Sequence, residues 1–183
     1  NWLRIRSPIT VRDGDKWARL APKEGRRGLR IRCDIDFEHP LIDRQAYTLD
    51  LSPQRYLQEI AGARTFGFKN EVDMLQSRGM ALGGSLDNAV VLDDFHVLNP
   101  GGLRYADEFV RHKVLDAIGD MSLLGHMVSG ELTCFKGGHA LHHQLCTELL
   151  RRPNAFAIAP ASRDRFAAAE SDSFADEQAG GVV

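Results

Sequence analysis

Residues 29–37 decide the fold class, and they have the sequence LRIRCDIDF. Apolar side chains occupy every second position from Leu29 to Phe37, and Arg or Asp fills each position between them. This period of two is typical of a β-strand with one buried face and one solvated face. The stretch therefore predicts the strongest strand of the chain, which Pro40 ends.

Further strands are expected on both sides of this segment. Short alternating stretches at residues 3–5 and 9–11 precede residues 13–15, where an Asp-Gly pair favours a tight hairpin turn. Residues 47–51 and 127–135 carry similar apolar patterns. The chain thus begins as a series of strands, and one more strand follows much later.

A helix is expected to start at Ser52, because serine is a good N-cap and Pro53 suits the first helical position. The helical period would then carry three apolar side chains inward, those of Tyr56, Leu57 and Ile60. This helix would follow directly on the strand before it.

Two longer helices and a small insert are predicted further along the chain. The longest helix covers roughly residues 108–124, and the last one continues through Leu149. Residues 67–97 have the pattern of a strand–helix–strand insert. The Ala-rich segment 153–183 loses periodicity and is expected to be a weakly ordered tail, which leaves residues 1–152 as one domain.

The composition excludes several classes of function. Hydrophobic residues make up 43% of the 183 residues and charged residues 26%, as in an ordinary globular domain. Lys plus Arg number 23 and Asp plus Glu 25, so the net charge of −2 gives no electrostatic footprint for nucleic acid. No apolar run approaches the roughly 18 residues that a membrane span needs.

The cysteines and the first residue give expectations about location and completeness. Cys33, Cys134 and Cys146 are odd in number and have no paired metal spacing, so we expect reduced thiols in a cytoplasmic protein. The chain begins at Asn1 without an initiator Met and without a signal peptide, which is consistent with a piece of a longer protein.

Candidate metal ligands lie on the longest predicted helix. His112, Asp116 and Asp120 are spaced by four residues, so they form one stripe along it. An imidazole nitrogen and a carboxylate oxygen one turn apart can bind one divalent cation such as Zn²⁺. The alternative is an ordinary His–Asp hydrogen bond on a helix surface. The spacing by itself favours this alternative over a metal site. Lys113, beside the stripe, adds a cation suited to an anionic ligand.

Two other segments carry candidate catalytic groups. Gly137 and Gly138 let the backbone approach closely and place His139 near the start of the last helix, where an imidazole can act as an acid or electrophile. Thr65 lies between a helix end and Gly67 and could present its hydroxyl or amide to a developing oxyanion. The alternatives are a histidine without a role and a helix terminus beside core aromatic residues.

Four ordered motifs give the chain a resemblance to a known family. They are HKVLDAIGD at residues 112–120, ARTFGF at 63–68, LGGS at 82–85 and GHAL at 138–141. Together they resemble the UDP-3-O-acyl-N-acetylglucosamine deacetylases, the zinc amidases of lipid A synthesis in Gram-negative bacteria. The resemblance covers about residues 9–152.

The resemblance implies an α+β fold, a two-layer sandwich of a mostly antiparallel β-sheet packed on two helices. A small β-α-β insert is expected at about residues 67–97. The family has two such domains with the active site between them, and this chain resembles the second, C-terminal one. The insert would form a passage for the acyl chain of the substrate, lined by Val72, Leu75 and Gly84.

The resemblance also implies roles for the site residues. His112 and Asp116 would be two of three zinc ligands, and an N-terminal domain outside this chain would supply the third ligand, a His, and a Glu general base. Asp120 and His139 would form the charged pair that stabilises the tetrahedral intermediate and protonates the leaving amine. Thr65 would help to hold the oxyanion.

Further residues would contact the substrate, an acylated UDP-N-acetylglucosamine. Phe66, Lys113 and Lys136 would contact its sugar nucleotide. The chain departs from the family pattern at His142 and His143, where two Asn are usual, and at Gly137, where Ser is usual. These changes lie next to the helix start that carries the predicted catalytic histidine.

The sequence therefore predicts a cytoplasmic, zinc-dependent hydrolase that removes the N-acetyl group of UDP-3-O-acyl-N-acetylglucosamine. This chain would supply about half of the active site, so alone it is expected to be inactive. The alternative is a non-catalytic fragment that folds and binds only nucleotide or acyl chain. Neither a nucleic-acid partner nor a membrane span is expected.

Overall fold

The alternating segment forms strand β4 (Leu29–Ile35), and its apolar side chains face the core as predicted. All four of them are at most 6% exposed. On the opposite face Arg30 forms a surface ion pair with Asp50 of the neighbouring strand. The sheet therefore has one buried face and one solvated face.

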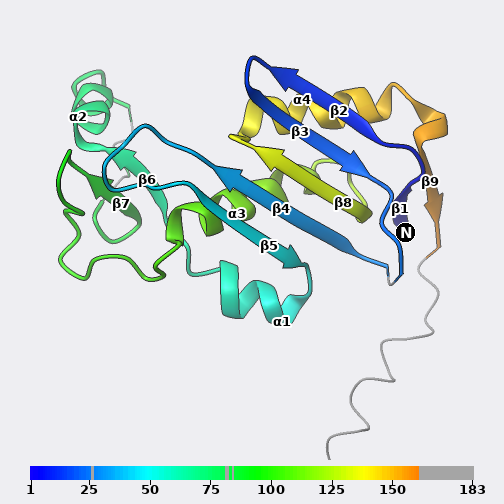
Figure 1. Cartoon of the computed structure of the whole chain (residues 1–183), viewed down its shortest axis with the longest axis horizontal. Coiled ribbons are helices and arrows are strands. Elements are labelled where there is room, and N and C mark those ends of the chain that lie inside the picture. Colours follow the sequence, from blue (N-terminus) through cyan, green and yellow to red (C-terminus); the bar gives the residue numbers. More distant parts are fainter. Residues whose placement is uncertain (26, 81–82, 84, 161–183) are drawn as a thin grey trace, which may run out of the picture.

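The computed structural model describes residues 1–25, 27–80, 83 and 85–160, and Figure 1 shows how its elements are arranged. In chain order the elements are β1 (Trp2–Ile5), β2 (Ile9–Asp13), β3 (Lys16–Ala21), β4 (Leu29–Ile35), β5 (Gln45–Asp50), α1 (Pro53–Arg55), the π-helical turn η1 (Tyr56–Ile60), β6 (Thr65–Phe68), α2 (Lys69–Ser77), β7 (Ala89–Leu92), α3 (Glu108–Ser122), β8 (Met127–Phe135), α4 (His139–Leu150), the 3₁₀ turn η2 (Pro153–Ala155) and β9 (Phe156–Ala159).

Strand β8 is the strand around which the seven-stranded main sheet is assembled. Its first residues pair with β1 in parallel, and its later residues pair with β4 in parallel and with β3 antiparallel. Strand β2 extends the sheet from β3, β5 from β4 and β9 from β1, all antiparallel. Four of these six pairs are antiparallel, which confirms the mostly antiparallel sheet.

Helices α3 and α4 form the second layer of the fold, on one face of the sheet (Figure 1). Helix α3 packs on β4 and β5, helix α4 packs on β2 and β3, and the two helices contact each other. Phe109 and Met121 of α3 and Leu145 and Leu149 of α4 are buried between the layers. The predicted α+β sandwich is thus confirmed. Among the helices of the described segments, none is both long and apolar enough to cross a bilayer.

The insert forms a separate two-stranded unit at one end of the molecule (Figure 1). Strand β6 pairs in parallel with β7, and helix α2, which connects them, packs on β6. The unit begins at Thr65, two residues before the predicted start at residue 67. The predicted acyl-passage residue Gly84 lies outside the described residues.

The helix predicted at Ser52 begins there but does not remain an α-helix. The Oγ of Ser52 accepts a hydrogen bond of 3.2 Å from the backbone N–H of Arg55, and after α1 the chain continues as the π-helical turn η1. A π-helix closes its hydrogen bonds at i+5, so different side chains share a face. Ile60 is fully buried, whereas Leu57 is 70% exposed. The prediction that Leu57 points inward is therefore wrong.

The ordered fold extends beyond residue 152, where the sequence predicts the end of the domain. The turn η2 leads into β9, in which Phe156 pairs with Ile5 and Ala159 with Trp2. The predicted start of the tail is therefore too early, because the last strand pairs with the first and local periodicity does not record such a contact. The remainder of the predicted tail, residues 161–183, lies outside the described part of the chain.

Candidate metal centre and catalytic site

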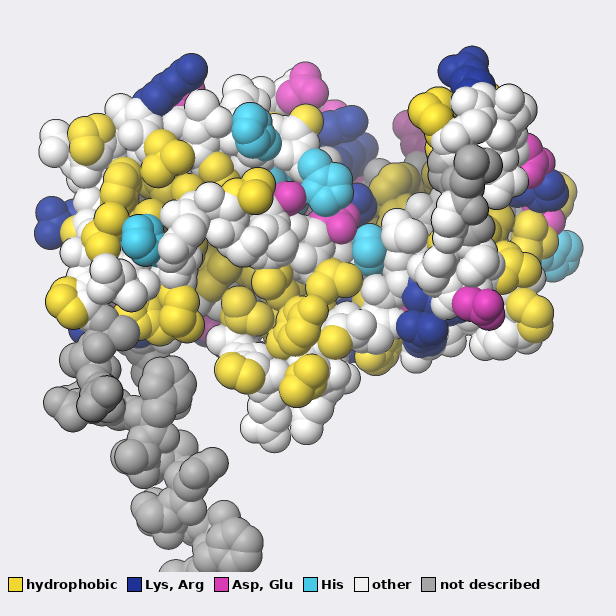
Figure 2. Space-filling model, turned by 180° about the vertical axis from the view of Figure 1, so that it is seen from behind, with side chains coloured by type: hydrophobic (Ala, Val, Ile, Leu, Met, Phe, Trp, Pro, Cys, Tyr) yellow, Lys and Arg dark blue, Asp and Glu magenta, His cyan; other side chains and the backbone are white. Residues whose placement is uncertain are grey.

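Helix α3 carries the predicted polar stripe beside its core face. Its buried side chains include Val110, Val114, Ala117 and Met121. His112, Asp116 and Asp120 are partly exposed and follow one another at intervals of one turn. Seen from the helix side, histidine and acidic side chains lie next to one another along a line toward the hollow that separates the main body from the insert (Figure 2).

The ring of His112 is held between two oxygen acceptors. Its Nε2 lies 3.2 Å from Oδ1 of Asp116, and its Nδ1 lies 3.2 Å from the carbonyl oxygen of Ala63. A neutral imidazole has a single N–H. If Nδ1 donates to the carbonyl, the lone pair of Nε2 faces a carboxylate oxygen. That arrangement requires either a second proton on the ring or a cation between Nε2 and Oδ1.

The donor set of this pair fits a zinc ion. Two ligand atoms bonded at about 2.0–2.2 Å to a tetrahedral ion lie roughly 3.4 Å apart, close to the 3.2 Å between His112 and Asp116. A backbone carbonyl on the second ring nitrogen is a usual partner of a metal-binding histidine. Burial would raise the pKa of Asp116, but the hydrogen bond with His112 and the charge of Lys113 lower it to about 2. Asp116 is therefore an anion at neutral pH.

Helix α4 begins with His139 and brings this residue to the same stripe. Nδ1 of His139 lies 2.9 Å from Oδ2 of Asp120, and its Nε2 lies 3.9 Å from Oδ1 of Asp116. Asp120 thus fixes one ring nitrogen and leaves the other on the side of the His112–Asp116 pair. The ring is 70% exposed, so an external molecule can reach it. The structure brings these four residues together, and their catalytic roles stay a prediction.

His142 adjoins the candidate site, where the sequence reasoning noted it only as a departure from the family pattern and gave it no role. Its Nδ1 lies 2.7 Å from Oδ2 of Asp120, so this carboxylate is shared by two histidines. The ring is 1% exposed. Burial would lower the pKa of His142, but Cys134 and Asp120 raise it overall. The spacing of three between His139 and His142 was a usable signal, because such residues share a helix face.

A buried ion pair holds the segment that carries the Ala63 carbonyl. The carboxylate of Glu108, which is fully buried, accepts hydrogen bonds from Nε, Nη2 and the backbone N–H of Arg64 and from the backbone N–H of Arg104. Burial would raise the pKa of Glu108, and these hydrogen bonds lower it overall. Thr65 follows Arg64 directly and opens β6 with an exposed side chain. Glu108 thus fixes both Ala63 and Thr65 relative to α3.

Two of the predicted substrate-binding residues lie beside the stripe. Lys113 pairs with Asp116 at 3.1 Å, and its Nζ lies 5.9 Å from the ring centroid of Phe66. Phe66 packs edge-on against Phe109, with the ring centroids 5.0 Å apart. The ring of Phe66, on the insert strand β6, is therefore packed on α3 near the ammonium group of Lys113.

The third predicted nucleotide-binding residue, Lys136, is held at a different place. Its Nζ lies 3.0 Å from Asp15 in the β2–β3 turn and 3.6 Å from Asp36 after β4. Its backbone has a φ of 51°, and its Nζ lies 5.3 Å from the ring centroid of Phe135. These interactions keep Lys136 at the end of β8, and none of the residues in them belongs to the stripe.

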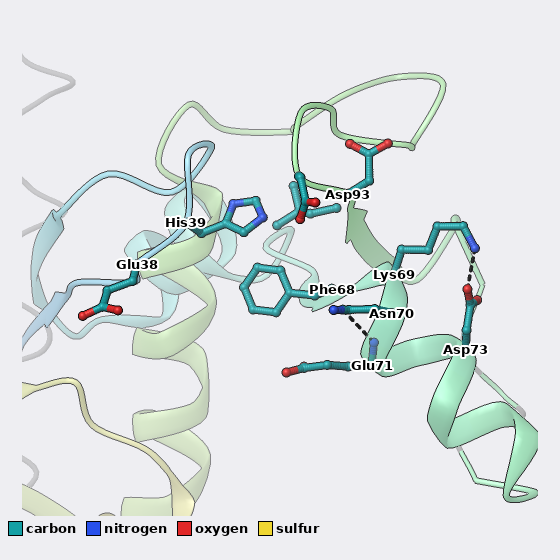
Figure 3. A pocket seen from close by; sticks show the side chains of 10 residues that line it. Glu38, His39, Phe68, Lys69, Asn70, Glu71, Asp73 and Asp93 are labelled. Carbon is teal, nitrogen blue, oxygen red and sulfur yellow. Dashed lines mark hydrogen bonds and ion pairs between the residues drawn. The ribbon is translucent and has the colours of Figure 1, made fainter.

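A pocket opens between the loop after β4 and the insert (Figure 3). The ring of His39 lies over Phe68 at one side, with centroids 4.7 Å apart, and Lys69 pairs with Asp73 at the other. Its lining includes the carboxylates of Glu38, Glu71, Asp73, Asp93 and Asp94. Such a lining is too acidic for an acyl chain.

The residues predicted to line the acyl passage do not line this pocket. Val72 and Leu75 are half-buried on helix α2, and Val72 packs over Gly67 of β6. Their role toward an acyl chain therefore stays a prediction.

The candidate metal site of the described residues has two side chains, those of His112 and Asp116. Within residues 1–160, apart from the few positions the structure does not describe, no group of three or more His, Cys, Asp or Glu side chains is arranged to hold a metal ion. The His112–Asp116 pair would therefore need ligands from elsewhere to complete a four-coordinate site.

Comparison with known proteins shows a consistent family relationship. The profile of the family "UDP-3-O-acyl N-acetylglycosamine deacetylase" matches residues 1–151. The chain is 51% identical over 161 residues to the UDP-3-O-acyl-N-acetylglucosamine deacetylase of Myxococcus xanthus (strain DK1622), covering 88% of this chain and 50% of the relative. The proteins of the same name from Shewanella sp. (strain W3-18-1) and Histophilus somni (strain 129Pt) are 49% and 48% identical over 86% and 85% of this chain. The chain spans about half the length of the curated relatives it matches.

Proposed function

Because the chain belongs to the UDP-3-O-acyl-N-acetylglucosamine deacetylase family, we propose that it supplies one half of a zinc-dependent deacetylase site. The reaction is hydrolysis of the N-acetyl group of UDP-3-O-acyl-N-acetylglucosamine, a step of lipid A biosynthesis in the cytoplasm. The observation that carries this proposal is the His112 ring, whose two nitrogens both face oxygen acceptors, with Asp116 on the side open to a cation.

His112 and Asp116 hold the zinc ion in this proposal. The carbonyl of Ala63 keeps the proton of His112 on Nδ1, which leaves Nε2 as the ligand atom. A bound zinc ion supplies a Lewis acid that polarises the amide carbonyl. The half of the relatives that this chain does not cover supplies the third ligand, a His, and a Glu general base.

His139 and Asp120 act on the charges that develop during amide hydrolysis. Asp120 accepts from Nδ1 of His139 and so sets the orientation of the ring. The other nitrogen, Nε2, then faces the reaction centre beside Asp116 and can stabilise negative charge on the carbonyl oxygen. The same N–H can pass its proton to the leaving amine, which is a poor leaving group unless protonated.

The insert and its neighbours bind the rest of the substrate. Thr65 assists in holding the oxyanion, since Glu108 fixes its backbone beside α3. Phe66 and Lys113 contact the sugar nucleotide from one side, with Lys113 matching its negative charge. Lys136 contacts it at the end of β8. Val72 and Leu75 border the acyl chain.

A complementation assay tests this proposal. The purified chain with added zinc is assayed alone and together with the separately produced half of the Myxococcus xanthus relative that this chain does not cover. We expect no appreciable turnover of UDP-3-O-acyl-N-acetylglucosamine by the chain alone and deacetylation by the mixture. The same mixture made with the His112→Ala chain should stay inactive.

Two results would contradict the proposal. Robust turnover by the chain alone would mean that it carries a complete site. Absence of turnover in the mixture, when the two halves of the relative are active together, would make this chain a non-catalytic fragment that binds only nucleotide or acyl chain.

A further inference from the structure

Two cysteines from distant parts of the sequence face each other in the main sheet, Cys33 near helix α3 and Cys134 near the start of helix α4. Cys33 of β4 and Cys134 of β8 are directly paired in the sheet, and their Sγ atoms lie 3.1 Å apart. Both thiols are free, and the residues are 1% and 2% exposed. Neighbouring strands lie about 4.7–4.9 Å apart, within the 4.4–6.8 Å that disulfide-bonded Cα atoms usually span. A bond between the two sulfurs therefore needs only a small side-chain movement.

The surroundings of the two sulfurs shift the pKa values of the two thiols in opposite directions. The hydrogen bond with Cys33 and the neighbouring ring of His142 lower the pKa of Cys134, against the opposing effects of burial and of the charge of Asp34. The hydrogen bond to Cys134 and burial raise the pKa of Cys33, with Lys113 and Asp116 facing it from α3. Cys134 is thus the more acidic of the two thiols and the one that more readily forms a thiolate.

Cys146 offers a contrast within the same chain. It lies on α4 and is 6% exposed, so it is buried like the other two. Burial and the charge of Asp120 raise its pKa to about 11. Its Sγ is 3.9 Å from the backbone oxygen of Asp120 and has no thiol partner among the described contacts. Cys146 is therefore a buried thiol whose nucleophilic thiolate is strongly disfavoured at neutral pH.

We propose that Cys134 and Cys33 form a redox-active dithiol, which a small hydroperoxide such as hydrogen peroxide converts to a disulfide. The Cys134 thiolate attacks one peroxide oxygen, the O–O bond breaks, and the hydroxide that leaves takes a proton from solvent to become water. The sulfur of Cys33 then attacks the resulting sulfenic acid. The S–S bond forms, the S–O bond breaks, and the departing hydroxide takes the Cys33 proton as a second water. The two thiols are oxidised and the peroxide is reduced.

The residues packed around Cys134 limit the size of an oxidant that can reach its sulfur. The backbone of Gly137 packs so closely that a Cβ there would lie 3.1 Å from Sγ of Cys134 and 3.0 Å from Nε2 of His142. Together with the exposure of only 2%, this excludes a bulky disulfide reagent, so the oxidant in the proposal is a small neutral molecule.

The dithiol is connected to the candidate catalytic pair through His142. This ring lies against Cys134 on one side, and its Nδ1 is 2.7 Å from Asp120 on the other. Its Nε2 makes no hydrogen bond to any of the residues the structure describes. Closure of the disulfide removes Cys134 as an ionisable neighbour that raises the pKa of this ring, so the pKa of His142 should fall on oxidation. The dithiol itself does not depend on the proposed deacetylase function.

The experiment uses the reduced 183-residue chain at pH 7.5 with hydrogen peroxide. Samples are quenched with an alkylating reagent and analysed by intact mass and peptide mapping. We expect a species that has lost two hydrogens, with the peptide of Cys33 joined to that of Cys134 and Cys146 still alkylated. We expect Cys134 to react at least about 100-fold faster than Cys146, because the thiolate is the nucleophile.

Matched variants separate the proposal from nonspecific oxidation. Cys33→Ser should accumulate sulfenic and sulfinic acid at residue 134 instead of the disulfide, while Cys146→Ser should form the disulfide at the wild-type rate. In denaturant the preference for Cys134 over Cys146 should disappear. Failure of the folded wild-type chain to form the Cys33–Cys134 bond, or equal reaction of Cys146, would overturn the proposal.

Discussion

The buried carboxylate of Glu108 accepts two side-chain hydrogen bonds from Arg64, at 2.9 and 3.1 Å, although 44 positions separate the two residues. This ion pair fixes the chain between η1 and β6 on the first turn of α3. That segment presents the carbonyl of Ala63 to His112 and leads into Thr65. The proposed metal ligand His112 and the proposed oxyanion residue Thr65 therefore have one common anchor.

Replacement of Glu108 should be strongly destabilising. Glu108→Gln leaves the guanidinium of Arg64 buried without its counter-charge, and breaking a buried pair in this way typically costs about 3–5 kcal/mol of unfolding free energy. Urea denaturation measures the change. Glu148→Gln is the control, since its pairs with Arg151 and Arg152 lie at the surface and should contribute less than about 1 kcal/mol. Similar small losses in both variants would argue against the anchor.

The isolated chain should bind zinc weakly through His112 and Asp116. Weak binding follows from the pair of ligands, since catalytic zinc sites normally use three protein ligands. His112→Ala and Asp116→Ala should each weaken binding by at least the roughly 10–100-fold that loss of an outer partner costs. Competition against a chromophoric chelator measures the affinity. His96→Ala serves as the control, because that ring is 77% exposed and pairs with Asp93. Unchanged affinity in the two ligand variants would remove the metal site.

His139 should be needed for turnover but not for zinc. In the mixture of this chain with the complementary half of the relative, His139→Ala should lower kcat by about 10²–10⁴-fold, the usual contribution of a general acid. Zinc content, measured on the same samples, should stay at the wild-type level. His143→Ala tests the specificity of the effect, since His143 is exposed one turn further along α4. Equal losses of zinc and turnover would make His139 a ligand or a structural residue.

The stability of the fold should depend on the ionisation of Glu59. Hydrogen bonds from Arg55 and Tyr47 lower the pKa of Glu59 from 4.5 to about 2 in the folded chain. The folded state therefore holds the proton less tightly than the unfolded state, so this stabilisation is fully present above about pH 5 and is lost as the pH falls toward 2. The side chain is 26% exposed, so we expect a contribution on the order of 1 kcal/mol.

The difference in unfolding free energy between wild type and Glu59→Gln checks this. Wild type should be the more stable at pH 6, and the gap should close as the pH falls through 4 toward 2. A difference independent of pH would mean that the carboxylate charge contributes nothing.

Local patterns in the sequence predicted most of the sheet and both large helices. Two such patterns involve only residues that lie close together in the chain: the alternation in β4 and the spacing of His112, Asp116 and Asp120. The structure has both as expected. The exposed Leu57 was not predictable in this way, because one π-helical turn changes which residues share a face.

The missed features depend on contacts between distant segments. Strand β9 exists because β1 offers it an edge, and Glu108 is buried because Arg64 reaches it. The Cys33–Cys134 contact depends on the register of β4 against β8. None of these contacts has a signature within a short window of sequence, so only the packed structure shows them.

Strand β8 has a consequence for how the chain folds. It pairs with β1, β3 and β4, and all three of these strands precede it by about a hundred residues or more. During synthesis they must wait for their shared partner while the insert and α3 are made, and closing such long loops carries an entropic cost that slows folding. Their unpaired edges are open to other chains in that interval. The step that protects the nascent chain from aggregation is thus the arrival of β8.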